Sequence, residues 1–448
     1  METKQAEFGR IPKRLFWAVA LVVATAFSPA TAGTISDANW TPVGSGMNAT
    51  VLALAVSGNN LYAGGSFTNA SGSNYVAQWD GNSWTAVGGG MNGAVRALAV
   101  SGTNLFAGGS FTMVGDRYYS HIARWDGTYW WGVSAGVDCD VYALAVSGTN
   151  LYVGGCFTTA IGTVNHIAMW NGFTWTALGP GLTNSTGGIV NVLAVSGNNL
   201  YAGGDFTRAG STPVYRIAKW DGSIWSALGL GMGGSVIPHV NALAVSGSDL
   251  YAAGLFTWAT NSGGVPVVVS NIAKWDGGTW TSLGSGLTVN LGANALAVSG
   301  SDLYAGGSFQ NAGGNPASAI AKWDGTNWTK MGSGVAGANP PTAFALAVSG
   351  SDLYVGGAFT NAGGKSCRRI ARAYLGTVPA LSLARSGSSA VVSWPTADTD
   401  GFALEQAAAL GAGSAWVSNT TAIADDGTNR WVAVPATDGA QFFRLSRP

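Results

Sequence analysis

The sequence predicts an all-β protein in which a seven-bladed β-propeller is followed by a small β-sandwich. Three observations lead to this fold: one short phrase occurs seven times, the two ends of the array of copies complement each other, and a different pattern of alternating runs follows residue 379. We expect residues 33–376 to form the propeller and residues 377–448 the sandwich.

The repeated phrase predicts the first strand of each unit. It reads essentially Ala-Leu-Ala-Val-Ser-Gly, and large and small side chains alternate in it as they do in a β-strand. A second run such as Leu61-Tyr62-Ala63-Gly64-Gly65 follows, and the Ser-Gly between the two runs favours a tight hairpin. The copies start 44 to 53 residues apart, at Ala53, Ala97, Ala143, Val192, Ala242, Ala295 and Ala345.

A second pattern, Ile-Ala-Lys-Trp-Asp-Gly-x-x-Trp in variants, predicts the third and fourth strands of each unit. Asp-Gly and Asn-Gly favour two-strand turns, and we interpret the aspartate as a turn residue that binds nearby N–H groups, not as a calcium ligand. Four strands in about 45 to 50 residues are typical of a propeller blade. We expect the tryptophans of one sheet to lie against glycines of the next.

The two ends of the array predict a closed ring. The seventh copy of the third strand, residues 370–374, lacks the tryptophan and the turn, and no fourth strand follows it. An unpartnered fourth strand, residues 40–44, stands before the first copy. In a ring, this N-terminal segment completes the last blade and removes both free sheet edges. We therefore expect Trp40 to belong to the last blade.

The first 32 residues have the pattern of a secretory signal peptide. Basic residues between positions 4 and 14 precede an apolar stretch at 15–27, and Ala30-Thr31-Ala32 follows it. This stretch is shorter than the roughly 20 residues that a membrane-spanning helix needs. We expect a protein that is secreted or held at the cell surface, without a membrane span.

The charge balance excludes one class of partner. Only 9% of the residues are charged, and 21 basic side chains balance 21 acidic ones. No excess charge is available to attract a polyanion, so we do not expect nucleic acid as a partner.

The repeat resembles a known family. Glycine pairs that end the second strand, an aromatic residue that ends the third and a tryptophan about five residues later resemble kelch repeats, with the architecture of the galactose-oxidase central domain. The runs Leu-Tyr-Ala-Gly-Gly-Ser-Phe-Thr and Ile-Ala-Lys-Trp-Asp-Gly are similar to propellers of secreted bacterial repeat proteins and of fungal cell-polarity surface markers, over residues 40–376. This resemblance implies a fold and leaves the function open.

The enzymes of that family bring a testable expectation. Galactose-oxidase-like enzymes hold copper with two histidines and two tyrosines, one of them linked to a cysteine. The three histidines of this chain, His121, His166 and His239, stand in no such grouping. We therefore expect no catalytic residues, no cofactor and no metal site.

The segment after residue 379 predicts the second domain. Six short alternating runs between residues 381 and 445 indicate strands of a small sandwich. This segment resembles the fibronectin-type-III-like or immunoglobulin-like domains that end many secreted bacterial proteins.

The strand order predicts where a ligand would bind. The fourth-to-first and second-to-third connections share one end of the ring, which we call the variable face because these connections differ between copies, whereas the turns at the opposite end are nearly identical. Binding is expected on the variable face. Candidate ligand-binding residues on it are Asp116, Tyr118, Tyr119, His121, His166, Arg216, His239 and Trp258.

Two smaller features leave alternatives open. His121 and His166 open the third strand in adjacent copies and could flank a metal or ligand, but with no thiolate or carboxylate fixed nearby we favour surface histidines left by repeat drift. Cys139 and Cys156 stand diagonally opposite in one hairpin, which allows either a disulfide or two half-buried thiols. Cys367 stays single in both cases.

Three functional hypotheses follow. The first is a monomeric, non-enzymatic secreted protein that binds a glycan, a protein or another surface component through the variable face. The second is an extracellular enzyme for carbohydrate or polyphenol substrates with its site at the axial end of the ring. The third is a structural component of a surface or matrix.

Overall fold

The computed structural model describes residues 35–68, 74–160, 162–185, 187–235, 237–376, 378–379, 381–386, 389–396, 402–408, 415–435 and 441–446. The chain divides into two compact units with their boundary between residues 377 and 378. The expected signal peptide, residues 1–32, lies outside the described residues. Within the described ranges, no helix is long and apolar enough to span a membrane.

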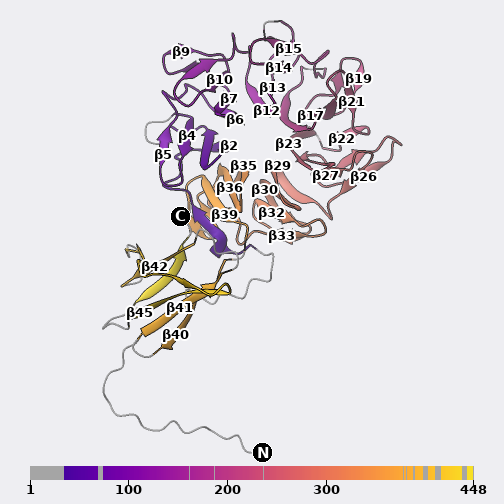
Figure 1. The fold of residues 1–448 in the computed structure, drawn as a ribbon. Helices are drawn as coiled ribbons and strands as arrows, with labels where there is room; N and C mark the ends of the chain where they lie inside the picture. Colours follow the sequence, from indigo (N-terminus) through magenta and orange to yellow (C-terminus); the bar gives the residue numbers. More distant parts are fainter. Residues whose placement is uncertain are drawn as a thin grey trace, which may run out of the picture. The chain divides into compact units, whose positions relative to one another are not determined.

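The larger unit is an all-β propeller of four-stranded antiparallel sheets, which confirms the all-β propeller part of the predicted fold class. Figure 1 shows the sheets around a common axis with their first strands innermost. Each first strand contacts that of the next sheet, and the last contacts the first of the array. The first strands are β2 (Val51–Ser57), β6 (Val95–Ser101), β12 (Val141–Ser147), β16 (Val190–Ser196), β23 (His239–Ser246), β29 (Leu287–Ser299) and β35 (Thr342–Ser349).

Each sheet continues outward through three further strands. The second strands are β3 (Asn60–Gly65), β7 (Asn104–Gly109), β13 (Asn150–Gly155), β17 (Asn199–Gly204), β24 (Asp249–Leu255), β30 (Asp302–Ala312) and β36 (Asp352–Ala358). The third strands are β4 (Val76–Trp79), β10 (Ile122–Trp125), β14 (Ile167–Trp170), β20 (Ile217–Trp220), β27 (Ile272–Trp275), β32 (Ile320–Trp323) and β39 (Ile370–Tyr374). The fourth strands are β5 (Trp84–Ala86), β11 (Trp130–Gly132), β15 (Trp175–Ala177), β21 (Trp225–Ala227), β28 (Trp280–Ser282), β33 (Trp328–Lys330) and β1 (Trp40–Pro42).

Short strands in the loops add small ribbons to these sheets. They are β8 (Met113–Val114), β9 (Arg117–Tyr118), β18 (Arg208–Ala209), β19 (Thr212–Pro213), β22 (Gly231–Gly233), β25 (Trp258–Thr260), β26 (Pro266–Val268), β31 (Asn315–Pro316), β34 (Val335–Ala336), β37 (Asn361–Ala362) and β38 (Lys365–Ser366). A turn of 3-10 helix, η1 (Asp37–Asn39), precedes β1.

The N-terminal strand completes the sheet that holds the C-terminal end of the array. β1 pairs with β39, and Trp40 stands opposite Ala373 in this register. The segment before β1 also reaches the neighbouring sheet, because the Gly332 N–H donates to the Ile35 carbonyl at 2.8 Å. Residues of this N-terminal segment thus bond to residues about 300 positions later in the sequence, and the Met47 N–H likewise donates to the Arg368 carbonyl.

The fourth-strand tryptophans join each sheet to the preceding one. The indole N–H of Trp84, for example, donates at 3.0 Å to the carbonyl of Val43, three residues after the equivalent Trp40. Trp175 is the exception, since its buried Nε1 has no hydrogen-bond partner among the described residues. The same bond, at 2.8 to 3.1 Å, joins Trp130 to Val87, Trp225 to Leu178, Trp280 to Leu228, Trp328 to Leu283 and Trp40 to Met331.

The glycines against which these tryptophans pack differ from our expectation. A Cβ on Gly88 would stand 2.7 Å from Trp130 Cδ1, and Gly88 lies in the loop arriving from the preceding sheet, not in the next sheet. The expectation was wrong because the indole points back towards the preceding sheet, where its N–H donates to the carbonyl of Val87, the residue before Gly88. The glycine at the end of a second strand faces a valine of the next sheet instead: a Cβ on Gly64 would meet Val95 Cγ1 at 2.5 Å.

Polar turns and cysteines complete the propeller. The carboxylate of Asp80 accepts the N–H groups of Asn82 and Ser83 at 2.8 and 2.7 Å, so the aspartate of the repeated Asp-Gly is a turn residue. Cys139 and Cys156 form a disulfide with their Cα atoms 5.6 Å apart. Cys367 is a buried free thiol, and burial raises its pKa to about 11.

The smaller unit contains two described antiparallel sheets, ordered β40–β41–β45–β44 and β43–β42–β46. Trp394 is 2% exposed and packs in one cluster with Val392, Val432, Val434 and, from the other sheet, Leu404. The strands are β40 (Ser382–Ser386), β41 (Ser389–Pro395), β42 (Ala403–Ala407), β43 (Val417–Ser418), β44 (Ala424–Asp425), β45 (Asn429–Pro435) and β46 (Phe442–Ser446).

Replacing Trp40 tests the closure of the propeller. Trp40 is fully buried, so we expect Trp40→Ala to lower the free energy of unfolding by about 3–5 kcal/mol, through lost burial and the cavity left behind. Urea denaturation measures this loss. Phe173→Ala is the control because Phe173 is 85% exposed, and its effect should stay within about 0.5 kcal/mol. A similarly small effect of Trp40→Ala would show that β1 does not complete the sheet.

Candidate binding site

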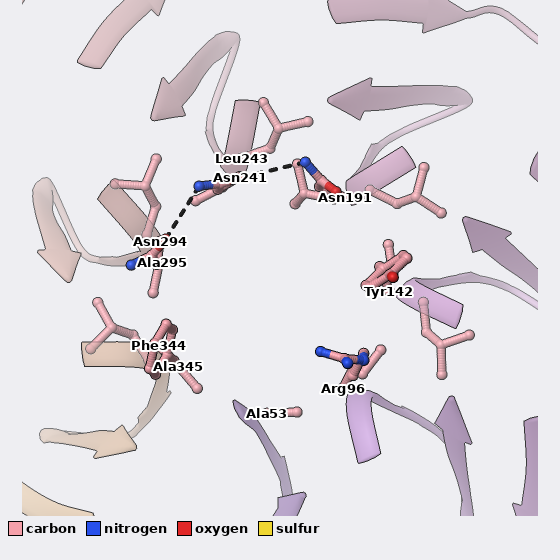
Figure 2. A pocket seen from close by; sticks show the side chains of 18 of the residues that line it. Ala53, Arg96, Tyr142, Asn191, Asn241, Leu243, Asn294, Ala295, Phe344 and Ala345 are labelled. Carbon is pink, nitrogen blue, oxygen red and sulfur yellow. Dashed lines mark hydrogen bonds between the residues drawn. The ribbon is translucent and has the colours of Figure 1, made fainter. Parts of the chain in front are cut away.

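A cavity of about 190 Å³ lies on the propeller axis and is lined by residues of the first strands. Figure 2 shows the side chains around it, from sheets that are far apart in the sequence. In six of the first strands, all but β2, the position directly before the repeated Ala-Leu (Val-Leu in β16) supplies the distinctive residues of this wall. These residues are Arg96, Tyr142, Asn191, Asn241, Asn294 and Phe344, and we call this end of the channel the mouth.

A β-bulge places this residue at the mouth. In β6 the pairing with β7 shifts between Val95 and Ala97, so Arg96 is an extra residue without an opposite partner. The other first strands shift at the equivalent place. A bulge bends the strand and re-aims a side chain while the flanking pairs stay in register. The same backbone can therefore present a different side chain from each sheet.

Three asparagines form a hydrogen-bonded row along one side of the mouth. The Asn191 amide donates to Asn241 Oδ1 at 3.4 Å, and the Asn241 amide donates to Asn294 Oδ1 at 3.2 Å. Figure 2 shows Asn241 and Asn294 across the opening from Arg96 and Tyr142, with Asn191 beside Tyr142. The bonds order the three amides before any ligand arrives, which lowers the entropy that binding costs.

The opposite side of the mouth carries charges that are already paired. Arg96 Nε lies 3.5 Å from Asp140 Oδ2, an ion pair that is too long for a hydrogen bond at Nε. The Arg96 guanidinium also lies over the Tyr142 ring, 5.3 Å from its centre. His121 Nδ1 is 3.6 Å from the other Asp140 oxygen and 3.1 Å from the Gly109 carbonyl. Of the predicted residues, His121 is thus the one beside the mouth.

The residue that opens each third strand has a left-handed backbone. The φ angles range from 61° to 72°, and none of these residues is glycine. For His121, the N–H donates to Phe111 and the carbonyl accepts from Gly109, at 2.9 and 3.0 Å, which holds the strained conformation. The equivalent residues are Tyr75, His166, Arg216, Asn271, Ala319 and Arg369.

The other two predicted histidines and Arg216 each bind a backbone carbonyl away from His121. His166 is 4% exposed and its Nδ1 lies 2.7 Å from the Leu182 carbonyl, so it is a core residue and not part of an open site with His121. The Arg216 guanidinium donates to the Asp205 carbonyl. His239 Nδ1 lies 3.0 Å from the Ile237 carbonyl. Among the described residues, no group of three His, Cys, Asp or Glu side chains could hold a metal ion.

The remaining predicted residues lie away from the mouth. Asp116, Tyr118 and Tyr119 belong to the β8–β9 ribbon and the residue after it, in the second sheet's loop. Trp258 lies in β25, with its ring against Gly233 and Gly234. The candidate residues chosen from the sequence therefore do not form one site.

The mouth residues themselves were missed by the sequence analysis. A signal for them existed, because the position before the repeated Ala-Leu varies while the residues after it hardly change.

Comparisons with known proteins leave the function open. No protein-family model and no curated protein matches this chain. Among solved structures, it is similar to the computationally designed Ika8 protein, with 16% identity and a TM-score of 0.43 over 78% of this chain and 94% of that one. BamB from Moraxella catarrhalis is 12% identical, with a TM-score of 0.39 over 75% of this chain and 97% of BamB. A puromycin-hydrolysing peptidase of Mycobacterium tuberculosis is 12% identical, with a TM-score of 0.43 over 81% of this chain and 60% of the peptidase.

His239 predicts a pH dependence of stability. Burial lowers its pKa below the ordinary value of 6.5, although the Ile237 carbonyl and the Asp205 charge act in the opposite direction. The unfolded chain then binds more protons than the folded one as the pH falls below 6.5. His239 therefore contributes stability that is complete above this pH and declines towards the lower folded pKa.

We expect the free energy of unfolding to fall less steeply between about pH 7 and about pH 5 in His239→Gln than in the wild type. Urea denaturation at a series of pH values gives both slopes. Equal slopes would contradict the partial burial of His239 as the cause of its lowered pKa.

Proposed function

We propose that this chain is a secreted, non-enzymatic binding protein that holds a neutral, hydroxyl-rich ligand, a glycan, over the mouth of the propeller channel. The observation that carries the proposal is the variation at the mouth position. The flanking residues of the first strands are nearly identical, yet this position holds an arginine, a tyrosine, three asparagines and a phenylalanine. A ring that only had to close would need no such difference between copies.

The chemistry of the mouth favours an uncharged ligand. Asparagine amides and the Tyr142 hydroxyl both donate and accept hydrogen bonds, as sugar hydroxyls do. The single cation of the wall, Arg96, is already paired with Asp140 and does not require an anionic partner. Phe344 supplies an apolar surface across the opening from Tyr142 and Arg96.

The proposal includes the finer points of architecture and location. The repeated sheets would form seven blades of a kelch-like propeller, residues 377–448 a small β-sandwich, and residues 1–32 a signal peptide that directs secretion. The strand orders of the sheets and the shared cluster around Trp394 support the first two points. The Cys139–Cys156 disulfide supports an oxidising compartment.

Substitution of Asn241 tests the mouth. Asn241→Leu inserts the residue that the first copy carries at this position, Leu52, so the fold should tolerate it. The probes are cellohexaose, laminarihexaose, xylohexaose and mannohexaose, with binding measured by isothermal titration calorimetry. We expect at least one probe to bind the wild type and Asn241→Leu to weaken it about tenfold or more, because the central amide of the row is lost.

Asn150→Asp is the matched control for this test. Asn150 lies in the hairpin at the opposite end of a sheet, where another copy carries Asp249. The Asn150→Asp variant should bind each hexasaccharide with the affinity of the wild type. Unchanged binding in Asn241→Leu would exclude the mouth as the ligand site.

A further inference from the structure

A second cavity, of about 490 Å³, lies in the second sheet, well within the range of small-molecule sites. Four aromatic side chains of the third and fourth strands and the turn between them line it, together with Tyr119 and Asp116. No residue lines both this cavity and the mouth. The four aromatic residues are Trp125, Tyr129, Trp130 and Trp131. We call this cavity the aromatic pocket.

Trp131 is an exposed tryptophan that the structure holds in place. It is 45% exposed, and its indole N–H donates to Asp126 Oδ2 at 2.7 Å. The other carboxylate oxygen accepts the N–H groups of Thr128 and Tyr129, at 2.8 and 2.7 Å. Hydrogen bonds from Tyr129, Trp131 and Thr128 hold the pKa of Asp126 below its ordinary range, so the carboxylate stays ionised and keeps the ring oriented. An oriented aromatic face loses little entropy when a ligand stacks on it.

The concentration of aromatics is special to the second sheet. Tyr129 is 65% exposed and Tyr118 is 73% exposed, and both precede Trp131, in the turn before the fourth strand and in the second-to-third loop. The other fourth strands carry threonine or serine at the position of Trp131: Thr41, Thr85, Thr176, Ser226, Thr281 and Thr329. Strand formation therefore does not require a tryptophan there, and exposing one costs solubility unless it is used.

Glycines bring the walls of the aromatic pocket together. A Cβ on Gly132 would stand 2.9 Å from Tyr119 Cδ1, and the Tyr119 hydroxyl donates to the Trp130 carbonyl at 3.2 Å. A Cβ on Gly89 would stand 3.2 Å from the Gly115 Cα. The second-to-third loop is thus folded against the fourth strand, which gives the pocket a defined shape.

We infer that the aromatic pocket binds a pyranose ring of a neutral glycan. A pyranose presents C–H groups on one face and hydroxyls on its edge. The Trp131 and Tyr129 rings can take the C–H face, and Asp116, Arg117 and Thr128 lie where hydroxyls need partners. The inference rests on the proposed function for the class of ligand alone, since the aromatic pocket and the mouth are separate sites.

Trp131→Thr tests the inference with the residue that most other copies carry. The four hexasaccharides of the mouth experiment are titrated into the wild type, Trp131→Thr, Asn241→Leu and the double variant. We expect Asn241→Leu to retain binding of at least one probe, and Trp131→Thr in that background to weaken it about tenfold or more, as loss of a stacking partner does. Phe173→Thr removes an exposed aromatic of the third sheet and should leave the affinity unchanged.

The outcomes separate the two sites. If Asn241→Leu abolishes binding of every probe, or if Trp131→Thr has no effect in that background, the inference is overturned while the mouth proposal stands. If Asn241→Leu weakens the binding of no probe and Trp131→Thr in that background removes it, the inference stands and the mouth proposal fails. If no probe binds the wild type, both are overturned. Thermal denaturation of each variant confirms that the fold is retained.

Discussion

The hydrogen bond from a fourth-strand indole to a carbonyl of the preceding sheet, which every described fourth-strand tryptophan except Trp175 makes, is the interaction on which the rest of the propeller depends. A four-stranded meander alone leaves both of its apolar faces in water, so the sheets must stack. Stacking could occur in many registers, and a directional bond such as that from Trp130 to Val87 selects one. A glycine at the contact, Gly88, is required because any side chain there would collide with the indole.

The bond from Trp40 to Met331 is the same interaction made by residues 291 positions apart in the sequence. It closes the array, and the sheet edges that remain are short outer strands such as β5, which offer another chain little to pair with. The loop-closure entropy of such a distant contact is the largest of its kind in the propeller. The surrounding bonds of Ile35 and Lys365 offset it by holding the N-terminal segment on two sheets at once.

Closure also determines what the channel can do. A repeated bulge places one residue of each first strand outside the regular pairing, and a repeated left-handed backbone precedes each third strand. Both devices are properties of the backbone, so side chains can differ without disturbing the sheets. The mouth combines residues from several sheets in this way. The aromatic pocket is built differently. Its lining comes from one continuous stretch of the sequence, residues 88–131, so it does not depend on contacts between the two ends of the array.

The sequence by itself determined the propeller class, the turn role of Asp80 and the place of Trp40, because period-2 alternation, turn chemistry and the offset of the array are local patterns. Only the tertiary structure decided which side chains meet. His121 and His166 have equivalent places in the sequence, yet one lies beside Asp140 and the other is buried against Leu182. Their surroundings come from the neighbouring sheet, and the angle between sheets is set by packing that no single strand pattern contains.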